Sequence, residues 1–122
     1  MERVETGIPG FDDILGGGFP RGSSTLVSGG TGTCKTIFTM QYIYNGAKLY
    51  NEPGLFVSIE TNVKNITWNM QSFGWDIREL QDNKMLNIYR LKFGSKLSME
   101  DQIESELETI GEIVREQKIK RL

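Results

Sequence analysis

The stretch "GGTGTCKT", residues 29–36, decides how this chain is expected to fold. It differs at one position from the phosphate-binding pattern G-x-x-x-x-G-K-[ST], which has glycine where Cys34 stands. A β-prone run, "STLVS" at residues 24–28, precedes the stretch, and an amphipathic helical pattern follows it. Strand, loop and helix in this order are the context in which such a loop binds phosphate.

The chemistry of a phosphate loop rests on its backbone. Successive N–H groups point at the phosphate oxygens, and the helix that follows presents its positive end to them. Lys35 is placed to reach the outer phosphates, and the Thr36 hydroxyl is placed to ligate a magnesium ion. The predicted binding residues are Gly29, Gly30, Thr31, Gly32, Thr33, Cys34, Lys35 and Thr36. The alternative is a glycine-rich turn that holds no ligand.

Cys34 departs from the pattern at the first helical turn. Its β-carbon and sulfur must fit where backbone and phosphate meet, and overpacking typically costs about 1–3 kcal/mol. Such a cost corresponds to roughly five- to 150-fold in affinity. Two interpretations stay open. One is a tolerated or degenerative substitution; the other is a redox-sensitive switch, because a helix N-terminus beside a lysine makes a thiol more reactive.

Strand and helix patterns alternate along the whole chain, which predicts an α/β fold with a parallel sheet flanked by helices. No linker divides the sequence, so residues 1–122 are expected to form a single domain. The predicted strands are residues 24–28, 54–60 and 84–93, and the predicted helices are residues 11–15, 36–50, 62–74, 77–81 and 98–122.

The segment 98–122 has the clearest helical pattern. Ser98 and Asp101 match a capping box. The apolar stripe consists of Ile103, Leu107, Ile110 and Val114. At the far end, Lys118, Lys120 and Arg121 are expected to complement the helix dipole.

Three acidic residues lie next to predicted strand ends or turns, where a carboxylate has either a chemical or a structural role. Glu60 comes at the carboxyl end of the second predicted strand, beside the edge where parallel sheets bind ligands. It is a candidate to orient an attacking water, and equally a charge at the N-terminus of the next helix. Asp12 and Asp13 are predicted to cap or solvate a turn rather than to bind metal.

Composition excludes several classes of protein. Apolar residues make up 38% and charged residues 25% of the chain, as in ordinary globular proteins. The formal charge is -2 and the basic residues are scattered, so the sequence does not support nucleic-acid binding. Apolar runs fall far short of the roughly 20 residues that span a bilayer. A single cysteine and no secretory signal predict a reducing, cytoplasmic location.

Four stretches, "TGIPGFDDILGGGFPRGS", "LVSGGTGTCKT", "GLFVSIE" and "FGWDI", occur in an order and spacing that resemble the KaiC-like branch of the RecA superfamily of ATPases. The resemblance implies a RecA-type parallel sheet, binding of ATP with Mg²⁺ at residues 29–36, and assembly into rings. It implies self-association or a KaiC-like partner subunit. It also places Glu60 on the first of two adjacent glutamates that activate water in many members.

Three positions depart from the family pattern. The second glutamate is Thr61, the last loop glycine is Cys34, and no Walker B strand follows residues 98–122. The sequence is therefore expected to correspond to the N-terminal part of the family's domain, truncated before Walker B. A sheet cut at this point is expected to leave an edge and an apolar face that favour association.

Three functions remain open from the sequence. The first is an ATP-binding protein whose hydrolysis is weak or absent in this chain alone. The second is a non-catalytic remnant or interaction module that docks with a full-length relative. The third is an ATPase that completes its site with a neighbouring subunit.

Overall fold

The computed structural model describes residues 2–30, 32–59, 63–92, 94 and 98–122. Its elements in chain order are β1 (Arg3–Val4), α1 (Phe11–Ile14), β2 (Phe19–Pro20), α2 (Lys35–Leu49), β3 (Gly54–Ser58), α3 (Val63–Gln71), α4 (Ile77–Asp82), β4 (Leu86–Arg90) and α5 (Met99–Glu116). β1 and β2 form a short antiparallel pair, and β3 and β4 form a parallel pair. Gly54 lies opposite Leu86, and Ser58 lies opposite Arg90.

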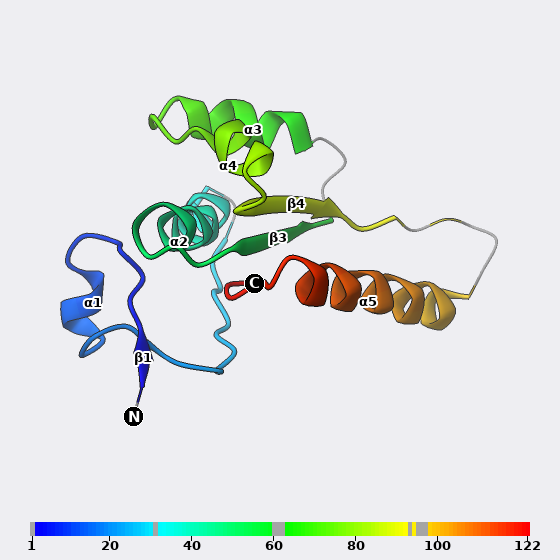
Figure 1. Cartoon of the computed structure of the whole chain (residues 1–122), viewed down its shortest axis with the longest axis horizontal. Helices are drawn as coiled ribbons and strands as arrows, with labels where there is room; N and C mark the ends of the chain where they lie inside the picture. The colour runs from blue at the N-terminus through cyan, green and yellow to red at the C-terminus, as the bar shows by residue number, and fades with distance from the viewer. Residues whose placement is uncertain (1, 31, 60–62, 93, 95–97) are drawn as a thin grey trace.

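The parallel pair lies between two helical layers. α3 and α4 lie on one side of it, and α5 lies on the other (Figure 1). Phe56, Leu86 and Ile88 pack with α2, α3 and α4 in the core. On the opposite face, Tyr89 donates a hydrogen bond from its Oη to the Glu106 carboxylate on α5. The predicted α/β class, a parallel sheet flanked by helices, is confirmed.

α2 is the central helix of the core. Its apolar residues recur every three or four positions, so they lie together on one face of the helix. Met40, Tyr44 and Ala47 on one face of the helix are buried, and Ile37 packs against them half-buried. A large apolar side chain buried in this way contributes about 1.5–3 kcal/mol. Tertiary packing therefore holds the helix that follows the predicted phosphate loop.

α3 covers the core from above in Figure 1 and is shorter than predicted. Ile66 and Met70 are buried, whereas Phe73 lies beyond the end of the helix and is 50% exposed. Gly74 follows with φ 77°, a left-handed conformation that glycine adopts without strain. The helix itself ends at Gln71, three residues before the stop predicted at Gly74.

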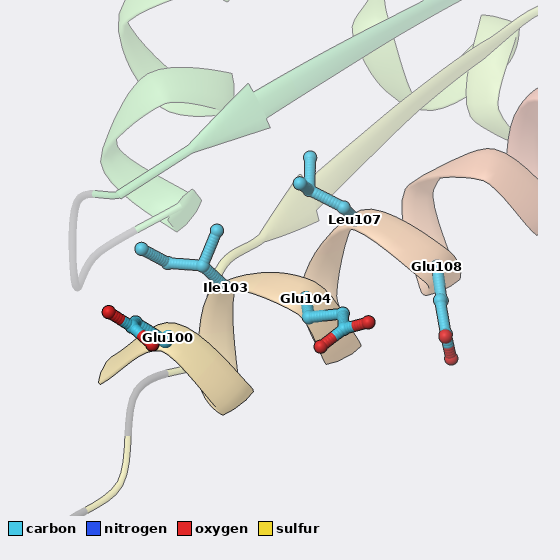
Figure 2. Close-up of a pocket in the computed structure, with 5 residues that line it drawn as sticks. All are labelled: Glu100, Ile103, Glu104, Leu107 and Glu108. Carbon is cyan, nitrogen blue, oxygen red and sulfur yellow. The ribbon is translucent and has the colours of Figure 1, made fainter. Parts of the chain in front are cut away.

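α5 begins at its predicted cap, where the Asp101 N–H donates to Ser98 Oγ at 3.2 Å. Its apolar stripe is only partly covered, since Ile103 and Leu107 are 45% and 62% exposed. These two side chains turn toward the strands (Figure 2). They line a hollow of about 510 Å³ together with Glu100, Glu104 and Glu108.

The predicted strand at residues 24–28 is wrong. The segment has no regular secondary structure and is mostly exposed, with Leu26 at 91%, and none of the described residues pairs with it as a strand. A groove of about 760 Å³, lined by Thr25, Val27, Val57 and others, separates this segment from β3. High β propensity does not make a strand unless a neighbour completes the hydrogen-bond ladder.

The free edge of β3 instead contacts the C-terminal residues. α5 ends at Glu116, so Lys118, Lys120 and Arg121 lie beyond it, and their predicted place in its last turn is wrong. The chain turns back along β3, where the Leu55 N–H donates to the Arg121 carbonyl at 2.8 Å.

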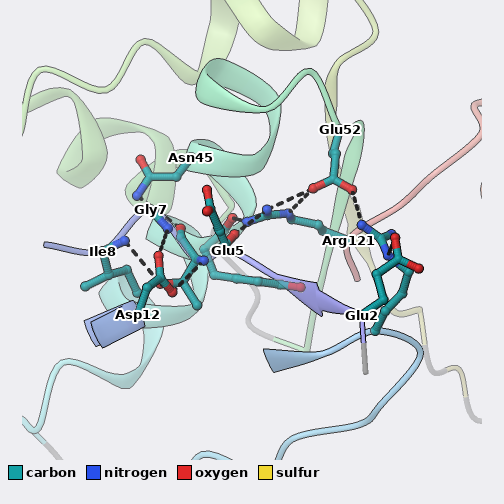
Figure 3. A network of polar contacts seen from close by, with 11 residues as sticks. Glu2, Glu5, Gly7, Ile8, Asp12, Asn45, Glu52 and Arg121 are labelled. Atoms are coloured by element: carbon teal, nitrogen blue, oxygen red, sulfur yellow. Dashed lines mark hydrogen bonds and ion pairs between the residues drawn. The ribbon is translucent and has the colours of Figure 1, made fainter. Parts of the chain in front are cut away.

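Arg121 is the largest fully buried side chain of the described residues, with 1% exposure. Its Nε and Nη2 donate to Glu52 Oε1 at 3.2 and 2.9 Å, and its Nη1 donates to the Tyr42 carbonyl at 3.0 Å. Nη2 also donates to the Glu5 carbonyl (Figure 3). Glu52 in turn lies 3.6 Å from Arg21. One guanidinium thus ties the N-terminal segment, α2 and the start of β3 together.

Gly46 on α2 makes room for this guanidinium. A Cβ at Gly46 would lie 2.9 Å from Arg121 Cζ and still closer to Cδ and Nε. We expect Gly46→Ala to lower the free energy of unfolding by about 1–3 kcal/mol, since the clash outweighs the better helix propensity of alanine. Gly111→Ala on α5 is the matched control, because its Cβ would meet only Arg115 Nη1 at 3.4 Å. Urea denaturation should show the control unchanged or stabilised by up to about 1 kcal/mol. If both substitutions changed the free energy of unfolding equally, the result would contradict the close packing of Arg121 against Gly46.

Candidate phosphate-binding site

The predicted phosphate loop lies directly before α2. Gly32 has φ 82° and Cys34 has φ 65° and ψ 30°, so both residues adopt the left-handed conformation. For Gly32 this conformation carries no strain, whereas for Cys34 it costs about 1–2 kcal/mol. The overpacking predicted for the Cys34 side chain against a phosphate stays a prediction. The structure shows a different feature, a left-handed backbone at an exposed Cys34.

Internal hydrogen bonds shape the loop. Lys35 folds its Nζ back to the Gly29 carbonyl, with the Gly30 carbonyl at 3.5 Å. Thr33 Oγ1 donates to the Gly30 carbonyl at 2.7 Å. A Cβ at Gly29 would lie 2.5 Å from Thr33 Oγ1, so glycine is required there for the close approach. The Lys35 ammonium is exposed at the loop, held only by carbonyl oxygens among the described contacts.

The N-terminus of α2 is without a side-chain cap. In α4 and α5 the caps Asp76 and Ser98 accept hydrogen bonds from backbone N–H groups, but Cys34 accepts none with its side chain. The first N–H groups of a helix have no intrahelical partner, and they carry the positive end of the dipole. This end of α2, with the Lys35 ammonium and the Thr36 hydroxyl in its first turn, has the donor set that suits a phosphate and its Mg²⁺.

Two predicted site residues, Thr31 and Glu60, lie outside the described residues, as does Thr61. β3 ends at Ser58, and Ile59 after it is 73% exposed. Within the described part of the chain, no group of three His, Cys, Asp or Glu side chains is arranged to hold a metal ion. The described residues therefore offer Mg²⁺ the Thr36 hydroxyl and no carboxylate cage.

The N-terminal turn is built around Asp12, as predicted. Its Oδ1 accepts from the Thr6 N–H at 2.9 Å and the Thr6 hydroxyl at 2.7 Å, and its Oδ2 accepts from the Gly7 N–H at 3.0 Å. Burial alone would raise the pKa of Asp12, but these hydrogen bonds outweigh it and hold the pKa below 3.8. Asp12 is therefore ionised at neutral pH and acts as a structural cap.

Phe11, beside this cap, contacts the helix that carries the loop, which sequence reasoning missed. Its ring meets Phe38 of α2 edge-to-face, with centroids 5.4 Å apart at 87°. Phe38 lies one turn after Cys34, whose carbonyl accepts from the Phe38 N–H at 2.9 Å. The aromatic residues of the glycine-rich N-terminal turn are visible in the sequence, but the sequence does not show which residues they contact.

Known proteins resemble this chain over nearly all of its length. A family model described as the KaiC ATPase matches residues 4–122. A circadian clock oscillator protein KaiC of Parathermosynechococcus lividus is 43% identical over 125 residues, covering 100% of this chain and 23% of that protein. A UPF0273 protein of Methanocaldococcus jannaschii is 51% identical over 82 residues, which are 67% of this chain and 34% of that protein.

A solved structure agrees with these matches. The crystal structure of a KaiC-like protein from the hyperthermophilic archaeon Pyrococcus horikoshii OT3 gives a TM-score of 0.87 at 39% identity. The match covers 99% of this chain and 51% of that one, so the chain spans about half the length of this relative. Among the described residues, no helix has the length and apolar content of a membrane span.

The structure and its relatives agree on a RecA-like α/β fold. Membership of such a family supports nucleotide binding, with Mg²⁺, at the level of the family. The chain belongs to the KaiC family of ATPases.

Proposed function

We propose that this chain binds Mg-ATP through residues 29–36 and hydrolyses it weakly or not at all on its own. The observation that carries the proposal is the uncapped N-terminus of α2, preceded by a glycine loop and carrying an exposed Lys35. Backbone N–H groups from Gly32 to Thr36 would contact phosphate oxygens. Lys35 would exchange its two carbonyl acceptors for the outer phosphates, and Thr36 would ligate Mg²⁺. The bound Mg²⁺ would neutralise part of the phosphate charge.

Weak hydrolysis follows from what the described residues provide. Water activation needs a base within hydrogen-bond reach of the attacking water, and no carboxylate bonds to the described loop residues. Glu60 is our proposed activator, from its position two residues after β3. The chain spans 51% of the KaiC-like protein of Pyrococcus horikoshii and 23% of the KaiC of Parathermosynechococcus lividus, so hydrolysis by a protein of that length would also draw on residues outside the matched region.

A second candidate function is a non-catalytic module that docks with a KaiC-like subunit. The strained Cys34 favours it, because strain in the loop opposes the bound conformation. A neighbouring subunit could also complete an ATPase site, and the partly exposed stripe of α5 supports association. Phosphate release on mixing with a full-length relative would favour the completed site, whereas docking without release would favour the module.

The test of the proposal is a titration of Mg-ATP against the native chain and Cys34→Gly. Glycine adopts φ 65° without strain, so the variant loop would spend more time in the binding conformation. Relief of about 1–2 kcal/mol would tighten binding roughly five- to thirty-fold. Lys84→Gly is the matched control, because Lys84 also has a positive φ, of 59°, but lies between α4 and β4. Isothermal titration calorimetry should show that Lys84→Gly binds Mg-ATP with the affinity of the native chain.

Protection of Cys34 from alkylation identifies where the nucleotide binds. Bound Mg-ATP should slow the reaction of this exposed thiol with iodoacetamide in the native chain. Binding by Cys34→Gly alone would favour the docking module over the nucleotide-binding protein. No binding by either chain would exclude the phosphate site in this chain.

A further inference from the structure

A continuous series of contacts links the buried Arg121 to the phosphate loop. Each guanidinium nitrogen has an acceptor: Glu52, the Tyr42 carbonyl or the Glu5 carbonyl. The guanidinium carbon also lies 4.6 Å from the centroid of the Tyr42 ring, within cation–π range. Arg121 therefore fixes both the backbone and the side chain of α2 at Tyr42.

Aromatic contacts continue from Tyr42 toward the loop. The Tyr42 ring meets Phe19 at 5.7 Å and 74°, and Phe19 meets Phe11 at 5.9 Å and 71°. Phe11 then meets Phe38 at 5.4 Å and 87°. All three pairs are edge-to-face, the arrangement that ring quadrupoles favour, and each contributes about 0.5–1.5 kcal/mol. The series ends one helical turn from the strained Cys34.

The loop itself has little cover. Gly32, Thr33, Cys34 and Lys35 are all exposed, so their own side chains bury little that could hold the loop in place. Phe38 is half-buried and is the first aromatic anchor of α2 after the loop. Movement of Phe38 would move the first turn, because its N–H makes the hydrogen bond that closes that turn on Cys34.

We propose that Arg121 and Phe11 are positioning residues for the phosphate loop. Arg121 fixes α2 at Tyr42, and the ring contacts transmit this restraint to Phe38 and so to the first turn at Cys34 and Lys35. The effect on nucleotide affinity rests on the proposed Mg-ATP function; the effect on loop geometry does not.

The test uses Arg121→Lys, Phe11→Leu and the double variant. Lysine keeps the charge but cannot donate to three separated acceptors, and leucine keeps apolar bulk without the ring. Tyr89→Ala is the control for lost stability, since Tyr89 bonds to Glu106 on the α5 side of the sheet and takes no part in the ring contacts. The measurement is hydrogen exchange of the Phe38 amide by NMR, without nucleotide, under conditions where every variant is folded.

We expect the Phe38 amide to exchange about tenfold faster in each single variant and no faster still in the double variant. Non-additivity of this kind is the mark of residues that act through one series of contacts. Mg-ATP affinity should fall about three- to tenfold in the same variants. Tyr89→Ala should leave both quantities unchanged after correction for its global stability.

Two failures are distinguishable. If Arg121→Lys changes exchange and affinity no more than Tyr89→Ala does, or if the two single effects simply add, the positioning role is overturned while nucleotide binding stands. If the native chain binds no Mg-ATP but the exchange pattern holds, the proposed function fails and the positioning of the loop stands.

Discussion

Lys35→Ala is expected to weaken Mg-ATP binding by about 30- to 150-fold while the fold stays intact. Lys35 is exposed, and among the described residues its ammonium donates to the Gly29 and Gly30 carbonyls, so its loss removes no core packing. With a phosphate, its ammonium would form charge-assisted hydrogen bonds worth about 2–3 kcal/mol. The loss of this free energy corresponds to an affinity about 30- to 150-fold weaker. The free energy of unfolding should change by less than about 0.5 kcal/mol.

Lys48→Ala provides the matched control, because Lys48 is an exposed lysine on the same helix, in its last turn. Both variants lose one positive charge, so both change the net charge of the chain equally. Isothermal titration with Mg-ATP should show near-native affinity for Lys48→Ala. Similar losses for both lysines would mean that nucleotide is attracted by general charge and not held by the loop.

Local patterns predicted most of the fold. The capping box placed the start of α5 at Ser98, and Gly74 lies in the turn that follows α3. The spacing of apolar residues gave α2 within about one residue at each end. These features depend on neighbours a few residues apart, and such neighbours are visible in a sequence.

Features that depend on distant partners were not predictable in this way. Residues 24–28 have strand propensity, but no described strand lies beside them to complete a ladder. Arg121 was assigned to a helix end from its charge alone, yet its acceptors lie 69 to 116 residues away in sequence. The same distinction holds for the candidate site, where the local pattern could be predicted and a distant contact could not. The pattern named Lys35 and Thr36, but the anchoring of their helix by Phe11 required the structure.

Arg121→Met is expected to lower the free energy of unfolding by about 3–5 kcal/mol. Removing one member of a buried ion pair leaves the charge of the other member without a partner. Here that member is Glu52, whose side chain is 17% exposed. The part-buried hydrogen bonds to the carbonyls of Glu5 and Tyr42 would also be lost, at about 0.5–1.5 kcal/mol each. Glu52 keeps Arg21 at 3.6 Å, which limits the electrostatic part of the loss. Urea denaturation should give this value, with Arg115→Met, an exposed arginine on α5, near zero.

Glu52→Gln separates the two sources of this loss. Glutamine can still accept from Arg121 but carries no charge, so this variant weakens the ion pair and leaves both carbonyl acceptors satisfied. If most of the loss comes from the carbonyls left without a donor, Glu52→Gln should lower the free energy of unfolding by less than half as much as Arg121→Met does. Equal losses would assign the stabilisation to the ion pair alone. A loss below about 1 kcal/mol for Arg121→Met would mean that water satisfies these acceptors, and the guanidinium would then not hold the N-terminal segment, α2 and β3 together.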